Sequence, residues 1–150
     1  MKSPVVILSL FLLASFSIIV VSRVNKLQKK RKQTRFENRI DRTIPATTVE
    51  WTDTVQNLGK VIEGTMVNVR FTFKNTGSRM LIVSDVAASC GCTIAEKPQK
   101  PFSPGEIGTI NATFDSKNRG GMNHKMLTVL LNTERRLQDL KFDVEVIAAK

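Results

Sequence analysis

The sequence predicts an all-β protein, a single β-sandwich of about seven strands with Greek-key connections, preceded by one N-terminal transmembrane helix and a basic stalk. Three observations lead to this prediction. Residues 4–22 carry no charge, and a run rich in Lys and Arg follows them. Beyond residue 46, short runs of alternating apolar and polar residues are separated by turn signals. We therefore divide the chain into a signal anchor (1–22), a basic juxtamembrane stalk (23–46) and a sandwich domain (47–150).

The positive charge of the chain is concentrated before the sandwich. The 150 residues have a formal net charge of +10. Residues 1–42 account for a net +8, and residues 43–150 for only +2. The domain itself is therefore close to neutral. Its length is sufficient to bury a hydrophobic core without stabilising disulfides or metal ions.

The uncharged stretch at residues 4–22 has the length of a membrane span. As a helix, its 19 residues would extend about 28 Å, close to the ~30 Å hydrocarbon core of a bilayer. The run is longer than the ~7–15 apolar residues of a cleaved signal peptide, and no Ala-x-Ala site follows it. A retained signal anchor is therefore favoured over a cleaved signal peptide.

The stalk is the expected lipid-facing segment. Its basic residues could contact anionic head groups, at about 1 kcal/mol for each residue near the surface, or could serve as a topology signal and solubilising spacer. Lys and Arg beside a span favour the cytoplasmic side. We expect no nucleic-acid partner, because the stalk would be held against the membrane. The basic residues are Arg23, Lys26, Lys29, Lys30, Arg31, Lys32 and Arg35.

The strands are predicted from period-two alternation. Val49 and Trp51 suggest a first strand, and residues 55–61 a second. The third is clearest, because Val67, Val69, Phe71 and Phe73 alternate with polar residues and a turn signal follows at residues 75–78. The fourth is expected over residues 81–86.

The second half of the domain continues the same pattern. Pro104-Gly105 suits a type II turn, in which Gly takes a positive φ. Further strands are predicted at residues 110–114, 126–131 and 140–146. Residues 126–131 are apolar on both faces, which indicates a central strand.

Several short motifs occur together in a recognisable order: Phe71-x-Phe73-Lys74-Asn75-Thr76-Gly77, then Ser89-Cys90-Gly91-Cys92-Thr93, then Pro104-Gly105-Glu106. With Leu58-Gly59-Lys60, Glu63-Gly64, Leu81-x-Val83-x-x-Val86, Phe114-Asp115 and Arg119-x-Gly121, they resemble the bacterial family called domain of unknown function 1573. The resemblance covers roughly residues 53–147. This family is related to Hydin-like (ASH) and PapD-like domains.

The resemblance implies an immunoglobulin-like sandwich, usually exported to a bacterial envelope, with no established activity. We accordingly expect no enzyme and no cofactor. The expected protein is a binding or scaffolding module on the bacterial inner membrane, whose partner is another protein. The resemblance places the domain in the periplasm, whereas the basic flank favours the cytoplasm.

Cys90 and Cys92 are the candidates for an alternative function in thiol redox chemistry or soft-metal handling. On an extended strand their Cα atoms would lie about 6.6–6.8 Å apart, at the long limit of disulfide geometry. A disulfide would therefore need the chain to bend, which Gly91 permits. The alternative is that both cysteines are small, buried or half-buried residues with a purely structural role.

A copper site is the second possibility for these residues. Met122, His124 and Met126 alternate and should share one strand face, and their donor atoms suit Cu(I) together with two thiolates. Nothing in the sequence places that strand beside the cysteines, so no metal site is predicted. The sequence also lacks a phosphate-binding loop, HExxH, GxSxG and CxxC.

Overall fold

The computed structural model of the chain describes residues 21–28, 30–31 and 44–148, and the chain divides into two compact units, Met1–Asn38 and Arg39–Lys150. In the first unit the described residues are helical and exposed. The predicted anchor at residues 4–22 lies outside the described residues except for Val21 and Ser22, as do Lys29, Lys32 and Arg35 of the stalk. No helix in the described part of the chain has both the length and the apolarity needed to cross a bilayer.

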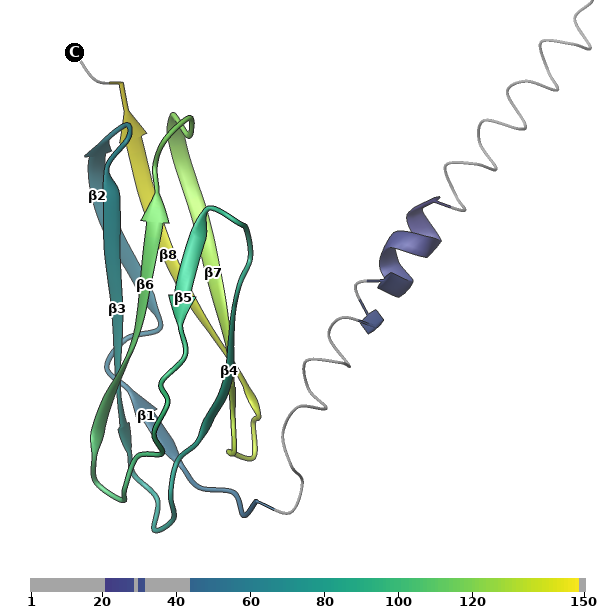
Figure 1. Cartoon of the computed structure of the whole chain (residues 1–150), viewed down its shortest axis with the longest axis vertical. Coiled ribbons are helices and arrows are strands. Elements are labelled where there is room, and N and C mark those ends of the chain that lie inside the picture. The colour runs from purple at the N-terminus through teal and green to yellow at the C-terminus, as the bar shows by residue number, and fades with distance from the viewer. Residues whose placement is uncertain (1–20, 29, 32–43, 149–150) are drawn as a thin grey trace, which may run out of the picture. The chain divides into compact units, whose positions relative to one another are not determined.

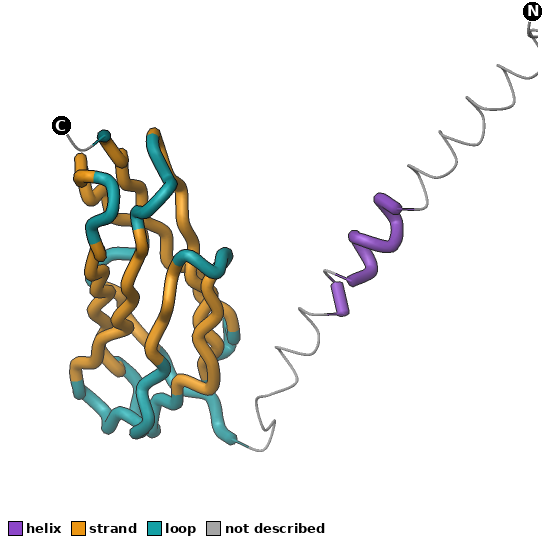
Figure 2. The backbone as a smooth tube through the Cα atoms, turned by 45° about the horizontal axis from the view of Figure 1, so that its top comes forward, coloured by secondary structure: helices purple, strands orange, loops and turns teal. Residues whose placement is uncertain are grey.

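The second unit is a sandwich of two four-stranded sheets (Figure 1), as the alternating pattern predicted. The first sheet has the order β1-β3-β6-β5 and the second the order β2-β8-β7-β4. Figure 2 shows that the connecting loops gather at the two ends of the sandwich. The strands are β1 (Val49–Trp51), β2 (Val55–Ile62), β3 (Met66–Asn75), β4 (Val83–Ala88), β5 (Thr93–Glu96), β6 (Ile107–Asp115), β7 (Gly121–Leu131) and β8 (Leu137–Ile147).

The sandwich has eight strands, and β5 is the strand that was not predicted. It has only four residues, and it turns the polar Thr93 toward the core and leaves the side chain of Ile94 67% exposed. Because this arrangement reverses the usual apolar-in alternation, the hydrophobic pattern did not reveal a strand here.

The core lies between the sheets and consists of the alternate residues that the pattern selected. Phe71 and Phe73 of β3 and Phe142 of β8 belong to one buried cluster, and all three are 0–1% exposed. The strand predicted to be central, β7, does lie between β8 and β4. The contact between Phe114 and Phe142 (6.0 Å between ring centroids) joins the two sheets, and Phe102, from the connection between β5 and β6, packs on Phe73 (4.9 Å).

The motif residues at the end of β3 hold the loops at one end of the sandwich. Asn75 is fully buried, and all of its hydrogen-bonding capacity is used. Its Nδ2 donates to the carbonyls of Arg79 (2.7 Å) and Phe102 (3.0 Å), and its Oδ1 accepts from Thr47 Oγ1 and Gly77 N (both 3.1 Å). A Cβ at Gly77 would lie 2.1 Å from Thr47 Oγ1, so only glycine fits there.

The predicted turn at Pro104-Gly105 is confirmed. Gly105 has φ +79°, and Glu106 N donates to Ser103 O at 3.0 Å, which closes a type II turn with Pro at its second position. Gly105 N also donates to Asn75 O at 2.8 Å. The turn therefore attaches the start of β6 to the end of β3.

Candidate functional site

The first candidate site is the edge of the first sheet where β5 ends. β5 pairs with β6 from Thr93 opposite Phe114 to Glu96 opposite Asn111, and Asp115 N donates to Cys92 O at 2.9 Å. In an antiparallel ladder, hydrogen-bonded pairs recur at every second residue. Residue 98 would therefore be the next hydrogen-bonded partner, opposite Thr109. Residue 98 is proline, which has no N–H to donate, so the ladder stops.

The ending of β5 leaves one edge of β6 open over residues 107–110. β6 still pairs with β3 here, with Thr109 opposite Thr72. Thr72 O accepts a hydrogen bond from Thr52 N (3.0 Å), so the main-chain groups of Thr72 point toward β1. The Thr72–Thr109 pair is therefore of the non-hydrogen-bonded kind, and the N–H and C=O of Thr109 point away from β3. Among the described residues, no strand pairs with β6 on that side over residues 107–110.

A hollow of about 350 Å³ lies along this open edge. Phe102 forms part of its wall and packs against Gly108, where an added Cβ would lie 2.4 Å from the ring. The side chain of Ile107 is 65% exposed at the rim. The remaining lining residues are Glu96, Lys97, Pro98, Thr109 and Asn111.

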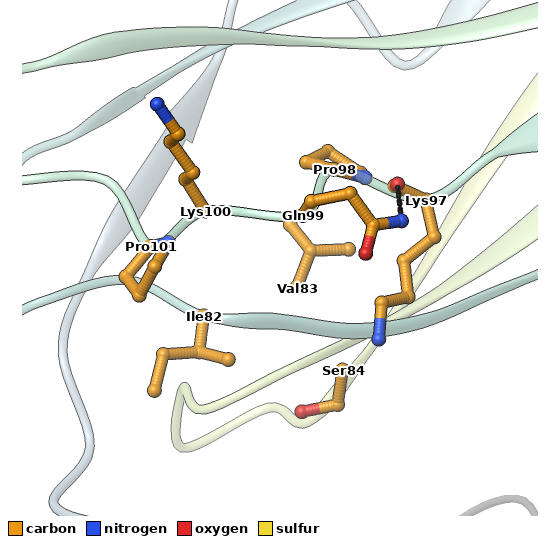
Figure 3. A pocket seen from close by; sticks show the side chains of 8 residues that line it. All are labelled: Ile82, Val83, Ser84, Lys97, Pro98, Gln99, Lys100 and Pro101. Atoms are coloured by element: carbon orange, nitrogen blue, oxygen red, sulfur yellow. Dashed lines mark hydrogen bonds between the residues drawn. The ribbon is translucent and has the colours of Figure 1, made fainter.

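A second hollow, of about 260 Å³, lies between the start of β4 and the segment that leaves β5 (Figure 3). Residues 97–101 form no strand, and the next residue, Phe102, pairs with Leu81 through two backbone hydrogen bonds of 2.9 Å. Lys97 and Lys100 extend from this segment, and Gln99 Nε2 donates to Lys97 O at 3.0 Å. The two hollows share Lys97 and Pro98, so both result from the departure of the chain after β5.

The second candidate site is the turn that joins β4 to β5. Cys90 and Cys92 form a disulfide, and their Cα atoms are 5.3 Å apart, shorter than an extended strand would allow. The bend is a turn in which Thr93 N donates to Cys90 O at 3.4 Å. Cys90 is half-buried, Cys92 is only 5% exposed, and Gly91 between them faces open space.

The disulfide adds little to the stability of the fold. It closes a loop of three residues, for which the loop-entropy relation gives about 1.6 kcal/mol, against ~3 kcal/mol for a 15-residue loop. Backbone hydrogen bonds hold both ends of the turn independently, from Ser89 N to Met126 O and from Asp115 N to Cys92 O (both 2.9 Å). The turn therefore keeps its main-chain anchors whether or not the sulfurs are joined.

The disulfide turn has charged neighbours of both signs: Asp115 lies opposite Cys92, and Lys125 lies near residue 90. Since Ser89 pairs with Met126, Lys125 is the next residue of β7 toward residue 90. Lys125 Nζ lies over the ring of Phe114, 5.5 Å from its centroid, and Phe114 is the ladder partner of Thr93. Partial burial lowers the pKa of Lys125 below its usual value, and the positive charge of Arg119 lowers it further.

The candidates for a copper site are only partly brought together. Met122, His124 and Met126 do share one face of β7, the outer face of the second sheet. His124 Nδ1 lies 2.7 Å from Asp143 Oδ1. The sulfurs of Cys90 and Cys92 are bonded to each other, and in the described part of the chain no three His, Cys, Asp or Glu side chains form a metal-binding group.

The fold and the open edge together define a small all-β sandwich module with an incomplete sheet edge. The chain belongs to a family of proteins of unknown function (DUF1573), whose sequence profile matches residues 49–146. This family is the one that the sequence motifs indicated. No curated protein matches the sequence.

Solved structures share the fold at low sequence identity. A protein of unknown function from Porphyromonas gingivalis W83 is 15% identical with a TM-score of 0.58, over 67% of this chain and 47% of that one. The chain thus spans about half the length of that protein. The ASH/PapD-like domain 7 of human CEP192 is 10% identical with a TM-score of 0.58, over 74% and 94%. The YadV chaperone is 13% identical with a TM-score of 0.50, over 65% and 51%. These likenesses show an ASH/PapD-like β fold.

Proposed function

We propose that the protein is a non-enzymatic interaction module of the bacterial envelope that accepts an extended segment of a partner protein along the open edge of β6. The observation that carries this proposal is the N–H and C=O of Thr109, which point to a side where β5 has ended. An added strand would satisfy both groups, and main-chain hydrogen bonds of this kind supply affinity in strand addition.

The hollow beside Thr109 supports the same proposal. Alternate side chains of an added strand point to opposite faces, so an apolar side chain of the partner would enter the hollow against Phe102 and Ile107.

The order of the two sheets corresponds to an immunoglobulin-like sandwich, with β2 added beside β8. One of the similar structures is a chaperone, a class of protein that binds other polypeptides.

A non-enzymatic role is supported by what the motif residues do. Phe71 and Phe73 fill the core, Asn75 and Gly77 hold the loops, and Gly105 forms a turn. The residues by which the family is identified are therefore engaged in maintaining the sandwich, apart from the cysteine pair considered below.

The membrane anchor and the side of the membrane are part of this proposal. Residues 4–22 have the composition of a span, and the stalk residues that follow could contact anionic lipid. The disulfide favours the periplasm, because disulfides persist in oxidising compartments. Alkaline phosphatase fused to the C-terminus should be active in cells, and an inactive fusion with an active cytoplasmic reporter would place the domain in the cytoplasm.

The docking edge is tested by site-specific photocrosslinking in cells. A photoreactive residue at Ile107 should capture a partner, whereas one at Met122, equally large and exposed but on the other sheet, should not. The substitution Thr109→Pro should abolish the adduct at Ile107, because it removes an N–H that makes no bond to β3. Pro98→Val should weaken the adduct as well, because it restores a donor opposite Thr109.

Two outcomes would count against the docking edge. Equal adducts at Ile107 and Met122 would indicate nonspecific contact with the protein surface and no binding site at the edge of β6. An Ile107 adduct that persists in folded Thr109→Pro and Pro98→Val variants would show that the partner does not use the main-chain groups of β6. The melting temperature of each variant serves as the folding control.

A further inference from the structure

We propose that the Cys90–Cys92 disulfide is a redox site that exchanges with the dithiol of another protein, with Cys90 as the sulfur attacked and Cys92 as the sulfur that leaves. This inference goes beyond the docking function and does not depend on it. It rests on the exposure of the two cysteines, on the hydroxyl beside them and on the way in which the turn is held.

The two cysteines differ in exposure. Cys90 is half-buried, follows the exposed Ser89 and packs at the margin of the core, whereas Cys92 is 5% exposed and belongs to the core itself. Gly91 has no atom of another residue within 4 Å of the position of a Cβ, so no side chain obstructs the approach over the turn. A thiolate from solvent therefore reaches Cys90 first.

Thr93 can assist the departure of the buried sulfur. Its Oγ1 lies 3.7 Å from Cys90 Sγ and 4.0 Å from Cys92 Sγ, and the residue is 5% exposed. A hydroxyl in this position can donate a hydrogen bond to a thiolate that forms on Cys92. Lys125 is the β7 residue nearest to position 90 in the pairing, and a nearby cation favours a thiolate over a thiol, whereas the carboxylate of Asp115, opposite Cys92, acts in the other direction.

The two electrons that open the disulfide come from the dithiol of the partner protein. The partner's first thiolate attacks Cys90 Sγ, the Cys90–Cys92 bond breaks, and its electron pair moves to Cys92 Sγ. The partner's second thiolate then attacks the partner's own sulfur in the mixed disulfide and releases the Cys90 thiolate. The partner leaves as a disulfide, oxidised by two electrons, and both cysteines of this chain are reduced and take up protons from water. In the reverse direction, Cys90 attacks a partner disulfide and Cys92 resolves the adduct.

The fold should tolerate both states, as a reversible exchange requires. The hydrogen bonds of Ser89 N with Met126 O and of Asp115 N with Cys92 O remain when the sulfurs separate. Reduction of the protein by dithiothreitol without denaturant should therefore open the disulfide and leave the circular dichroism spectrum unchanged.

The roles of the sulfurs are tested with two matched variants that each retain one thiol. Cys92→Ser exposes the thiol of Cys90, and it should react with a nitroaromatic disulfide about tenfold faster or more than the thiol left by Cys90→Ser. Thr93→Val should slow reduction of the wild-type disulfide severalfold, whereas Thr113→Val, on the outer face of β6, should not. Lys125→Met should move the pH profile of Cys90 labelling in the Cys92→Ser background to higher pH.

A second measurement avoids the serine variants in case they fail to fold. Glutathione is mixed with the wild-type protein, the reaction is quenched by acid, and the first adduct is located by mass spectrometry. The proposal requires the adduct on Cys90. An adduct mainly on Cys92, equal labelling rates of the two single-thiol variants, or a disulfide that dithiothreitol opens only in denaturant would each overturn it.

Discussion

Replacement of Gly108 by alanine should destabilise the sandwich, although alanine is normally favoured over glycine in a strand by ~0.5–1 kcal/mol. A Cβ at this position would lie 2.4 Å from Phe102 Cε1 and 2.5 Å from Phe73 Cζ. Carbon atoms pack best at about 3.5–4.0 Å, so the rings would have to move by ~1 Å or more. Phe73 is 1% exposed and has no room to retreat, and Phe102 packs edge-on against it.

From this overlap we expect Gly108→Ala to lower the free energy of unfolding by about 2–3 kcal/mol, the upper part of the range for overpacked cores. Urea denaturation followed by the fluorescence of Trp51 measures it, and the m-value should not change. Gly120→Ala is the matched control, because its Cβ would meet no atom within 4 Å.

The double variant Gly108→Ala/Phe102→Ala identifies the cause of the loss. Removal of the Phe102 ring makes space for the new methyl group, so the double variant should cost at least ~1 kcal/mol less than the sum of the two single variants. Strict additivity, or a cost of Gly108→Ala below about 0.5 kcal/mol, would refute the close packing of Phe102 beneath the open edge.

Three further predictions concern single side chains. Asn75→Ala should cost about 3–4 kcal/mol in urea denaturation, because it removes all four hydrogen bonds made by a fully buried side chain; a cost below ~1 kcal/mol would contradict the network. Asn75→Asp should be more destabilising at pH 7 than at pH 4: burial raises the pKa of the new carboxyl above its unfolded value of ~3.9, so stability is lost as the pH rises through that window. The reverse trend would show that the carboxylate is compensated. Trp51→Phe should lie within about 1 kcal/mol of the wild type in thermal melts, because Trp51 Nε1 is buried without a hydrogen-bond partner among the described residues. Trp51→Ala should lose ~3 kcal/mol, because it also removes the ring contact to Phe73. Equal losses for the two variants would show that the indole N–H matters.

The sandwich could be predicted because most of its strands follow one rule. In the central parts of β3, β6 and β8 the apolar residues alternate with polar ones and face the core, although Met66, Ile107 and Ile147 at the strand ends are exposed. The Pro-Gly turn was likewise predictable, since its backbone geometry depends on two residues alone. β5 broke the rule with an exposed Ile94, and it was missed for that reason.

The two candidate sites depend on pairing that a single sequence does not specify. Pro98 signals the end of a strand, but its effect on Thr109 follows only from the register that sets Glu96 opposite Asn111. The spacing of Cys90 and Cys92 suggested separated sulfurs on an extended strand, and the turn closed by Thr93 N brings them together instead. Their proximity to Lys125 likewise follows from the pairing of Ser89 with Met126.

The open edge of β6 is tested most directly by amide hydrogen exchange at single-residue resolution on the purified protein. The amide of Thr109 should exchange at least ~100-fold faster than that of Thr113, whose ladder partner on β5 is Ile94. In the Pro98→Val variant the difference should shrink as β5 lengthens. Equal protection of Thr109 and Thr113 in the wild-type protein would mean that the edge is already occupied and has no place for a partner strand.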